Sequence, residues 1–377
     1  MSEPLVRGWC PGAYRPMMSG DGLVVRVRPR LARLTREQVL GLCDAATRHG
    51  NGIVELTNRA NLQLRGVTEA AHAPLLEALA ALDLLDADPA LEVRRNILTP
   101  PFAEPGDLTA RLAEALVARL ADLPPLPAKF GFAIDTGSAR LLADASADIR
   151  LERGAAGGLI LRADGAETGR PVDEEHAIDA VIETARWFAD HHGPDTRRMA
   201  RLVAARGLPG GWTGAASAPL GARPEPGDTA IGPLVGVPFG QVRADALRAL
   251  IQASGARALR VTPWRLVLAE GGQMPDLPDF VTRPGDRRLA VDACPGAPLC
   301  PQAQGETRAL ALELAARVTG SLHVSGCAKG CARRLPADLT LTARDGRFDL
   351  IRNGRAGDAP DRRGLTHDDL LKLAEPC

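Results

Sequence analysis

Cys294-Pro-Gly-Ala-Pro-Leu-Cys300 and Cys327-Ala-Lys-Gly-Cys331 are the two stretches from which the organisation of the chain can be worked out. Four thiols in two tight pairs, 27 residues apart, are typical of a site for a soft metal, either an iron–sulfur cluster or zinc. Paired zinc ligands usually have roughly two to four residues between them. The five residues between the first two cysteines therefore favour a [4Fe–4S] cluster, with zinc as the alternative. The predicted metal ligands are Cys294, Cys300, Cys327 and Cys331.

The segment between the two pairs is predicted to bring them together. Apolar residues recur there at four-residue spacing: Leu310, Leu314 and Val318. This spacing predicts a helix that Gly320 ends. Leu322-His-Val324 then indicates a short strand that leads to Cys327, and His323 on it is expected to be packed rather than to bind metal.

The composition is that of an ordinary globular protein, with 45% hydrophobic and 24% charged residues among 377, enough for two or three domains. The formal net charge is zero, so the chain as a whole has no attraction for nucleic acid or for an anionic membrane. No apolar run reaches the ~18 residues of a membrane span, and the first residues lack the apolar stretch of a secretory signal. A cytoplasmic location is therefore expected, where thiols stay reduced.

The remaining cysteines are not predicted to be ligands. Cys43 lies on a helical stripe with Val39 and Ala46 and is expected to be a small buried hydrophobe. Cys10 and Cys377 have no predicted role.

Residues 14–86 have the element order of a ferredoxin-like half. The predicted elements are a strand, a helix, two strands and a second helix: residues 22–29, 35–49, 53–57, 62–65 and 68–85. Thr35 is the predicted N-cap of the first helix, and Asn58-Arg-Ala-Asn61 forms a polar corner between the paired strands.

Residues 87–205 are predicted to form an α/β domain. Its expected elements are a helix, two strands and a second helix: residues 107–120, 148–151, 158–162 and 177–189. Gly and Pro crowd residues 206–229, which are therefore the predicted linker.

The first pattern returns in residues 230–275, the predicted second ferredoxin-like half. Its expected elements are a strand, a helix and two strands: residues 232–238, 244–253, 258–262 and 265–268. In both halves the strand before the corner ends in threonine, at Thr57 and Thr262. Residues 285–377 complete the chain as a second α/β domain that carries the cysteines. The expected fold is therefore of the α+β and α/β classes and arose by an internal duplication of about 200 residues.

Several stretches together resemble the sulfite and nitrite reductase family. The spacing C-x5-C and C-x3-C is similar to that family's cluster motif. Three upstream stretches are similar to its T-x-R-x-x-x-Q corner, its R-N step and its L-P-x-K-F turn: Thr57-Asn-Arg-Ala-Asn-Leu-Gln63, Val93-Arg-Arg-Asn-Ile97 and Leu126-Pro-Ala-Lys-Phe130. The resemblance covers nearly the whole chain and implies a pseudo-duplicated architecture with two ferredoxin-like halves and two α/β domains. It implies that Arg59, Arg95 and Lys129, each alone an ordinary surface charge, face a tetrapyrrole and its ligand.

One departure from the family pattern bears on the function. Gly131 stands where the reductases usually have a second lysine, so the pocket for a small anion is reduced. Arg7-Gly-Trp-Cys-Pro-Gly12, Pro16-Met-Met-Ser-Gly-Asp-Gly22 and the short length resemble the cobalamin-pathway branch of the family, in which the tetrapyrrole is substrate rather than cofactor. That resemblance implies an O2-dependent monooxygenase that converts precorrin-3A to precorrin-3B, by hydroxylation at C20 with formation of a γ-lactone.

The resemblance also implies two iron centres, the [4Fe–4S] cluster and a mononuclear non-haem iron whose ligands the sequence does not reveal. Lys329 and Arg333, beside the second cysteine pair, are explained as well by solvent exposure as by substrate contact. His367-Asp-Asp369 is better explained as the start of a helix than as a ligand set. No G-x-G-x-x-G follows a strand, so a separate NADH-dependent reductase is the expected electron donor.

Two alternatives stay open at this point. The first is a sirohaem-dependent sulfite or nitrite reductase, in which Cys331 would join cluster and haem iron. The second is a binding protein held together by zinc and without enzymatic activity.

Overall fold

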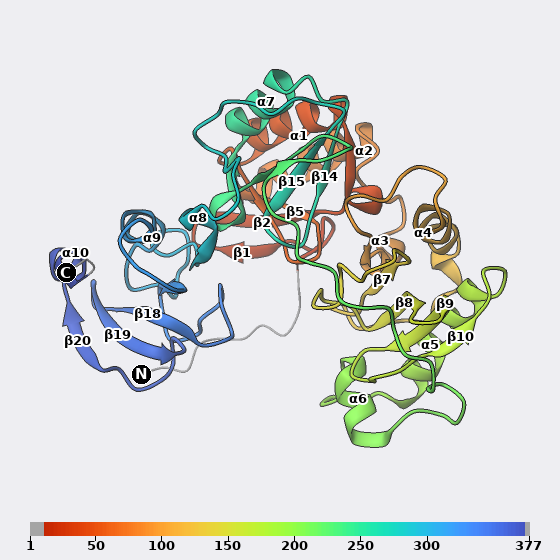
Figure 1. The fold of residues 1–377 in the computed structure, drawn as a ribbon. Coiled ribbons are helices and arrows are strands. Elements are labelled where there is room, and N and C mark those ends of the chain that lie inside the picture. Colours follow the sequence, from red (N-terminus) through yellow and green to blue (C-terminus); the bar gives the residue numbers. More distant parts are fainter. Residues whose placement is uncertain (1–10, 374–377) are drawn as a thin grey trace.

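The computed structural model describes residues 11–373, and two antiparallel five-stranded sheets form the centre of this region (Figure 1). In spatial order, sheet A consists of β1 (Met17–Ser19), β2 (Gly22–Val27), β5 (Leu62–Val67), β4 (Ile53–Leu56) and β13 (Gln241–Arg243). Sheet B consists of β11 (Gly227–Asp228), β12 (Pro233–Gly236), β15 (Leu266–Glu270), β14 (Ala258–Val261) and β3 (Arg33–Thr35). Cys10, Cys377 and the segment Arg7-Gly-Trp-Cys10 lie outside the described residues.

Three helices lie over these sheets: α1 (Arg36–His49), α2 (Glu69–Ala81) and α7 (Ala244–Ala253). As predicted, Thr35 caps α1, in a capping box in which its hydroxyl accepts from the Gln38 N–H and its own N–H donates to the Gln38 side chain. Cys43 is fully buried, as expected, and burial raises the pKa of its thiol to about 11. It is therefore a packing residue.

Each ferredoxin-like half gives one short strand to the sheet of the other half. Leu34 on β3 lies opposite Leu259 on β14, and Val242 on β13 lies opposite Val54 on β4. All four side chains are buried in one continuous hydrophobic core. The two halves therefore share one hydrophobic core. The sequence did not predict this arrangement, because β3 and β13 have only three residues each.

The predicted internal duplication is confirmed in atomic detail. The hydroxyls of Thr57 and Thr262 each accept from the backbone N–H groups two and four residues later, at 3.1–3.3 Å. Three residues after each threonine comes a residue with positive φ, Ala60 (51°) and Arg265 (61°). The short 3-10 helices η1 (Arg30–Ala32) and η3 (Pro238–Gly240) likewise precede the exchanged strands β3 and β13. The geometry of the corners therefore repeats at a separation of 205 positions, and the 3-10 helices and exchanged strands repeat at 208.

The two α/β domains lie on opposite sides of the central sheets, and their own sheets have the same topology (Figure 1). The first sheet contains three parallel strands and then two antiparallel ones: β6 (Ile97–Leu98), β7 (Phe132–Asp135), β8 (Ile149–Gly154), β9 (Gly157–Ala163) and β10 (Arg170–Val172). The second repeats this order: β16 (Val291–Ala293), β17 (Leu322–Ser325), β18 (Ala337–Arg344), β19 (Arg347–Gly354) and β20 (Arg362–Leu365). The duplication therefore extends beyond the ferredoxin-like halves.

Helices cover these outer sheets. The first domain contains α3 (Pro89–Arg94), α4 (Leu108–Ala118), the 3-10 helix η2 (Leu120–Asp122), α5 (Ala177–His191) and α6 (Met199–Arg206). The second contains α8 (Arg287–Ala290), α9 (Arg308–Ala315) and α10 (His367–Leu373). The prediction that Val318 lies on the helix between the cysteine pairs is wrong, because α9 ends at Ala315 and Ala316 caps it. His367 begins a helix, as expected.

Most of residues 206–229 lies outside regular helices and strands and returns along the first α/β domain toward sheet B. Isolated bridges join this segment to that domain: Ala215 with Gly169, Ser217 with Gly154 and Leu220 with Arg140. Within residues 11–373, no helix combines the length and the apolar character that crossing a membrane requires.

Sheet B has a buried carboxylate at its centre that holds the exchanged strand. Glu270 on β15 has only 1% of its side chain exposed. Arg33 on β3 donates to both of its oxygens at 2.9 and 3.0 Å, and Arg257 and Arg260 donate at 2.9 and 2.7 Å. Chiefly because of the bonds from Arg33, the pKa of Glu270 lies far below its ordinary value.

Substitution of Glu270 by Gln should destabilise the shared core, because it leaves buried Arg260 without its counter-charge. We expect a loss of ~3–5 kcal/mol at pH 7 in urea unfolding, the usual cost of breaking a buried ion pair. Since the folded-state pKa is lowered, the carboxylate stabilises the protein above the unfolded value of 4.5 and progressively less as the pH falls below it. The stability of the variant should therefore depend less on pH in that acid range.

The matched control is Asp245→Asn, which removes an ion pair with Arg243 in which both side chains are about two-thirds exposed. It should cost less than about 1 kcal/mol. Equal losses in the two variants would contradict the role given to Glu270.

Candidate metal centre and adjoining cavities

The two cysteine pairs meet at one edge of the second outer sheet. Cys294 directly follows β16, and Cys327 comes two residues after the end of β17. These strands are parallel, so their carboxyl ends lie at the same edge, where the side chains of following loops converge. The N–H of Gly326 donates to Cys294 Sγ at 3.1 Å and thereby joins the two loops.

The four thiols lie close enough to influence one another electrostatically. Burial raises the pKa of Cys331, and nearby Cys294, Cys327 and Cys300 raise it further. Burial raises the pKa of Cys327 as well, again with contributions from Cys294 and Cys300. A set of thiols that oppose one another's ionisation can bind a cationic metal group in exchange for their protons. The predicted ligands are therefore gathered in one place.

The donor set fits a polynuclear cluster, in which each iron takes its own thiolate, so the four sulfurs need not meet at one point. Across residues 11–373, no three His, Cys, Asp or Glu side chains are gathered tightly enough to hold a single metal ion. The described part of the chain thus presents no ligand set for the mononuclear iron that the resemblance implied.

A glycine and a threonine fix the shape of the first cysteine loop. Gly296 has φ of +69°, and a Cβ at this position would lie 2.6 Å from Thr307 Oγ1. That hydroxyl donates to the carbonyl of Cys294 at 2.6 Å, while the Cys300 N–H donates to the Gly296 carbonyl at 2.8 Å. The loop is therefore packed against Thr307, the N-cap residue of α9, with no space for a larger residue at position 296.

Sheet A holds the far end of the same loop. The carbonyl of Leu299 accepts from Ser19 Oγ at 2.9 Å, from the Gly20 N–H at 3.2 Å and from Arg65 Nη2 at 3.1 Å. Arg65 is 5% exposed and also pairs with Asp21 at 2.7 Å. A buried cation thus links the first half of the chain to the cysteine loop.

This link continues as a row of alternating charges. Glu55 Oε2 accepts from Arg65 at 3.3 Å, and Glu55 Oε1 accepts from Arg308 Nη2 at 3.2 Å. Arg308 is the first residue of α9 and is close enough to Cys294 for their charges to interact. The order Asp21, Arg65, Glu55, Arg308 therefore joins sheet A to the candidate metal centre.

One cavity opens beside the thiols, and a second adjoins it. The first, of 190 Å³, has Cys294 and Cys331 in its wall together with Leu56 and Arg265. The second, of 330 Å³, is lined by residues that include Asn58, Arg140, Ser146, Arg223 and Trp264. At the first corner, Leu56 lines the first cavity and Asn58 the second. At the second corner, Arg265 lines the first cavity and Trp264 the second. The two cavities therefore lie side by side.

Of the three predicted basic residues, Arg59 contacts a residue that lines the second cavity, whereas a contact of the Lys129 ammonium with a ligand stays a prediction. Arg59 Nη2 donates to Ser146 Oγ, which lines that cavity, at 2.8 Å, and reaches the carbonyl of Lys129 at 3.5 Å. Arg223, which the sequence did not reveal, lies on the same cavity and donates to the Trp264 carbonyl at 3.4 Å. Burial and nearby Arg265 lower the pKa of Arg223. The wall of this cavity therefore contains two cationic groups, those of Arg140 and Arg223, and one carboxylate, that of Asp144.

Arg95 is placed differently. It is 8% exposed and forms an ion pair with Asp86 at 2.8 Å. Its neighbour Asn96 contacts the turn that carries Lys129, through Nδ2 and the carbonyls of Ala128 and Phe130. A direct contact of Arg95 with a ligand stays a prediction.

Gly131, at the position of the family's second lysine, is closely surrounded by backbone atoms. The N–H of Gly131 donates to Asp148 Oδ2 at 3.0 Å. A Cβ here would lie 3.2 Å from the Asn96 carbonyl oxygen and 3.3 Å from that of Ser146. A side chain at position 131 would therefore displace the backbone around it.

The other residues considered in the sequence have mainly structural contacts. Arg333 pairs with Asp292 at 3.0 Å, whereas Lys329 is exposed. His323 is fully buried as expected, burial lowers its pKa to about 4, and neither ring nitrogen has a hydrogen-bond partner among the described residues. The sequence carried no signal for Arg265 or Arg308, which belong to no recognised motif.

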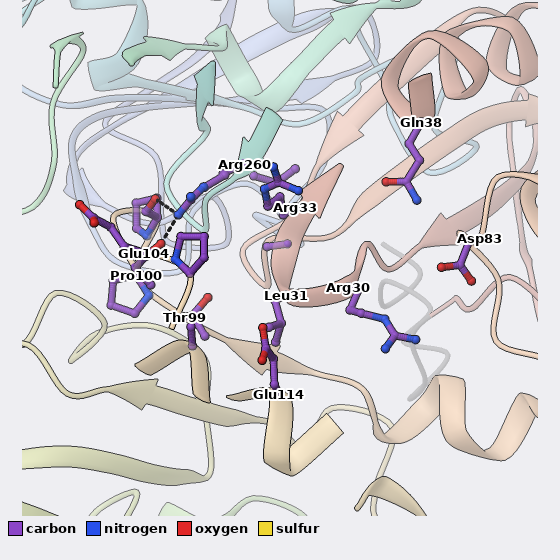
Figure 2. Close-up of a pocket in the computed structure, with 16 residues that line it drawn as sticks. Arg30, Leu31, Arg33, Gln38, Asp83, Thr99, Pro100, Glu104, Glu114 and Arg260 are labelled. Atoms are coloured by element: carbon purple, nitrogen blue, oxygen red, sulfur yellow. Dashed lines mark hydrogen bonds between the residues drawn. The ribbon is translucent and has the colours of Figure 1, made fainter. Parts of the chain in front are cut away.

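The first repeat contains a counterpart of the cysteine-side cavity, drawn in Figure 2. It has a volume of 430 Å³ and is lined by η1, by Arg260 and by the segment after β6, residues 99–105. Figure 2 shows Arg260 turned into that segment, where Nη1 donates to the carbonyls of Pro101, at 3.0 Å, and Ala103. Residues 99–105 contain no cysteine. Only the second repeat therefore places thiols at this position.

Comparison with known proteins agrees with the predicted family. Residues 15–82 match the family described as nitrite/sulfite reductase ferredoxin-like half domain. A precorrin-3B synthase from a Sinorhizobium species is 33% identical over an alignment of 396 positions, which covers 94% of this chain and 84% of that protein. The solved structure of the NirA protein of Mycobacterium tuberculosis superposes with a TM-score of 0.67 at 19% identity, over 93% of this chain and 79% of that one. The structural likeness establishes the fold.

Gly296→Ala should weaken metal binding, because its Cβ would push Thr307 away from the cysteine loop. We expect about tenfold or greater loss of affinity, as is usual when groups that support metal ligands are disturbed. Iron retained per chain in a chelator titration would measure it. Gly285→Ala is the matched control, since Gly285 also has positive φ but has nothing within 4 Å of a Cβ. Equal iron retention in the two variants would count against the packing argument.

Proposed function

Because the chain belongs to the precorrin-3B synthase family, it is an oxidoreductase of cobalamin biosynthesis, and we propose that it hydroxylates precorrin-3A at C20 with O2 to give the γ-lactone precorrin-3B. The observation that carries this proposal is the pair of adjoining cavities. One has Cys294 and Cys331 in its wall, and the other has Arg140 and Arg223 in its wall, with Arg59 bound to a lining residue. Such a site can place a polyanionic macrocycle beside a redox centre.

A [4Fe–4S] cluster would be held by the four thiolates of Cys294, Cys300, Cys327 and Cys331. It would supply electrons one at a time. The chain supports that role with its own groups. The Gly326 N–H donates to a ligand sulfur, and the Thr307 hydroxyl fixes the carbonyl of Cys294. The bond to sulfur is of the kind that tunes the potential of a cluster, and the bond from Thr307 holds the loop in shape.

The basic residues would orient the substrate. Precorrins carry many carboxylates, and guanidinium groups recognise carboxylates in a fixed, often bidentate geometry. Arg223 lines the second cavity and Arg59 contacts Ser146 in its wall. Lys129 lies on a third segment, whose backbone Arg59 contacts. We expect the three side chains to contact different edges of one macrocycle. The formal net charge of zero makes this local concentration of cations the source of attraction.

The reaction needs an external reductant. One atom of O2 enters the macrocycle and the other leaves as water, which requires two electrons and two protons. The sequence has no G-x-G-x-x-G after a strand, so we propose that a separate NADH-dependent reductase supplies the electrons.

Anaerobically purified protein should contain about four irons and four acid-labile sulfides per chain. Its absorption spectrum should show only the broad band of the cluster, at about 400 nm. Cys327→Ala should lose most of this iron, whereas Cys43→Ala should keep it, because Cys43 is a buried core residue in α1. A strong haem Soret band would favour a sirohaem-dependent reductase instead. One zinc with neither iron nor sulfide would establish the zinc-bound alternative.

Arg59→Gln should raise the KM for precorrin-3A roughly 10–100-fold, since a charge-assisted hydrogen bond contributes ~1.5–3 kcal/mol. Arg59→Lys should restore part of the loss. Steady-state kinetics with O2 and a reductant would measure both. Arg243→Gln, at an exposed residue paired with Asp245, is the control and should behave as the unmodified enzyme. Unchanged KM in Arg59→Gln would remove Arg59 from the substrate site.

A further inference from the structure

Arg308 is a largely buried cation, and two of its three side-chain nitrogens have no hydrogen-bond partner among the described residues. Its side chain is 15% exposed, and one nitrogen, Nη2, donates to Glu55 at 3.2 Å. The other two, Nε and Nη1, are inaccessible to solvent and have no hydrogen-bond partner among residues 11–373. Buried N–H groups of a charged side chain are costly to leave unpaired, so such a residue needs an explanation.

The surroundings of Arg308 suggest what completes its bonding. It lines the 190 Å³ cavity together with Cys294 and Cys331, and Cys294 is close enough to interact with its charge. Its one carboxylate partner, Glu55, is shared with Arg65. The other carboxylate in the cavity wall, Asp292, already pairs with Arg265 at 3.2 Å and with Arg333 at 3.0 Å. The sulfur atoms at the thiols are therefore the acceptors we assign to the two remaining nitrogens of Arg308.

We propose that Arg308 is a positioning residue that holds a positive charge against the metal centre, donates to its sulfur atoms and raises its reduction potential. The inference rests on the proposed [4Fe–4S] cluster. The redox step concerned is the uptake of one electron by the oxidised cluster from a reductant such as dithionite, with no bond made or broken.

The physical reason is the charge of the cluster. Four thiolates make the assembly anionic, and reduction adds one further negative charge. A fixed cation nearby stabilises the reduced form more than the oxidised form, and hydrogen bonds to sulfur act in the same direction. Burial strengthens both effects, because the effective dielectric constant is lower than in water.

Glu55 provides a test of sign. If charge is what matters, removal of the carboxylate should act in the opposite direction from removal of the guanidinium. If Arg308 only ties α9 to β4, Glu55→Gln should not raise the potential, because it keeps the acceptor oxygen on which that tie depends. Gln at position 55 keeps the shape and an acceptor oxygen, so it isolates the charge.

The experiment is a dithionite-poised redox titration of the full-length, cluster-loaded protein, followed by the EPR signal of the reduced cluster. Arg308→Met should lower the ratio of reduced to oxidised cluster at a fixed potential about tenfold, which is 59 mV for one electron. Glu55→Gln should raise that ratio, and Arg308→Lys should retain most of the original value. Arg317→Met, at an exposed position beyond the end of α9, should leave it unchanged.

Iron and sulfide are counted first in every variant. Absence of both from the unmodified protein would overturn the proposed cluster, whatever Arg308 does. A loaded cluster whose potential is the same in Arg308→Met and in the unmodified protein would overturn the inference alone. A shift of the same sign in Arg308→Met and Glu55→Gln would also overturn it, because the effect would then be one of structure rather than charge.

Discussion

The contact between Arg65 and the carbonyl of Leu299 is the one on which the geometry of the site depends. It is made by a side chain that is 5% exposed and that two carboxylates, Asp21 and Glu55, keep in place. Arg65 lies on β5, and Leu299 lies in the cysteine loop, 234 residues later in the chain. This bond therefore holds the cysteine loop in a fixed position relative to sheet A. The smaller cavity has residues of both parts in its wall, Leu56 of sheet A and Cys294 of the cysteine loop, so its shape depends on this contact.

Sheet B contains an equivalent ion pair in which the acidic and the basic residue have exchanged strands. At the separation of 205 residues, Glu55 and Arg65 correspond to Arg260 and Glu270. In each sheet the acidic and basic residues pair, and in each the arginine also binds the carbonyls of a loop from an outer domain. Both repeats therefore have a buried ion pair and a loop held by an arginine, whereas only the loop of the second repeat contains thiols.

Much of the fold could be read from the sequence, because hydrophobic periodicity and capping are local signals. Thr35, the two threonine corners and the cysteine pairs are examples. The exchanged strands β3 and β13 could not, since three residues give no periodicity and their partners lie far away in the chain. The local motifs nominated Arg59, Arg95 and Lys129 in the sequence. Arg223, Arg265 and Arg308 belong to no such motif and acquire their positions only through tertiary packing.

The exchange of strands has a consequence for biosynthesis on the ribosome. The edge of β4 is complete only when β13 pairs with it, and Gln241–Arg243 are made nearly 190 residues after Ile53–Leu56. At the usual speed of translation, ~5–20 residues per second, sheet A remains open at that edge for roughly 10–40 s. An unpaired strand edge is a template for aggregation. The nascent protein therefore has a defined interval in which chaperones are most needed, and it ends when the second half of the chain emerges.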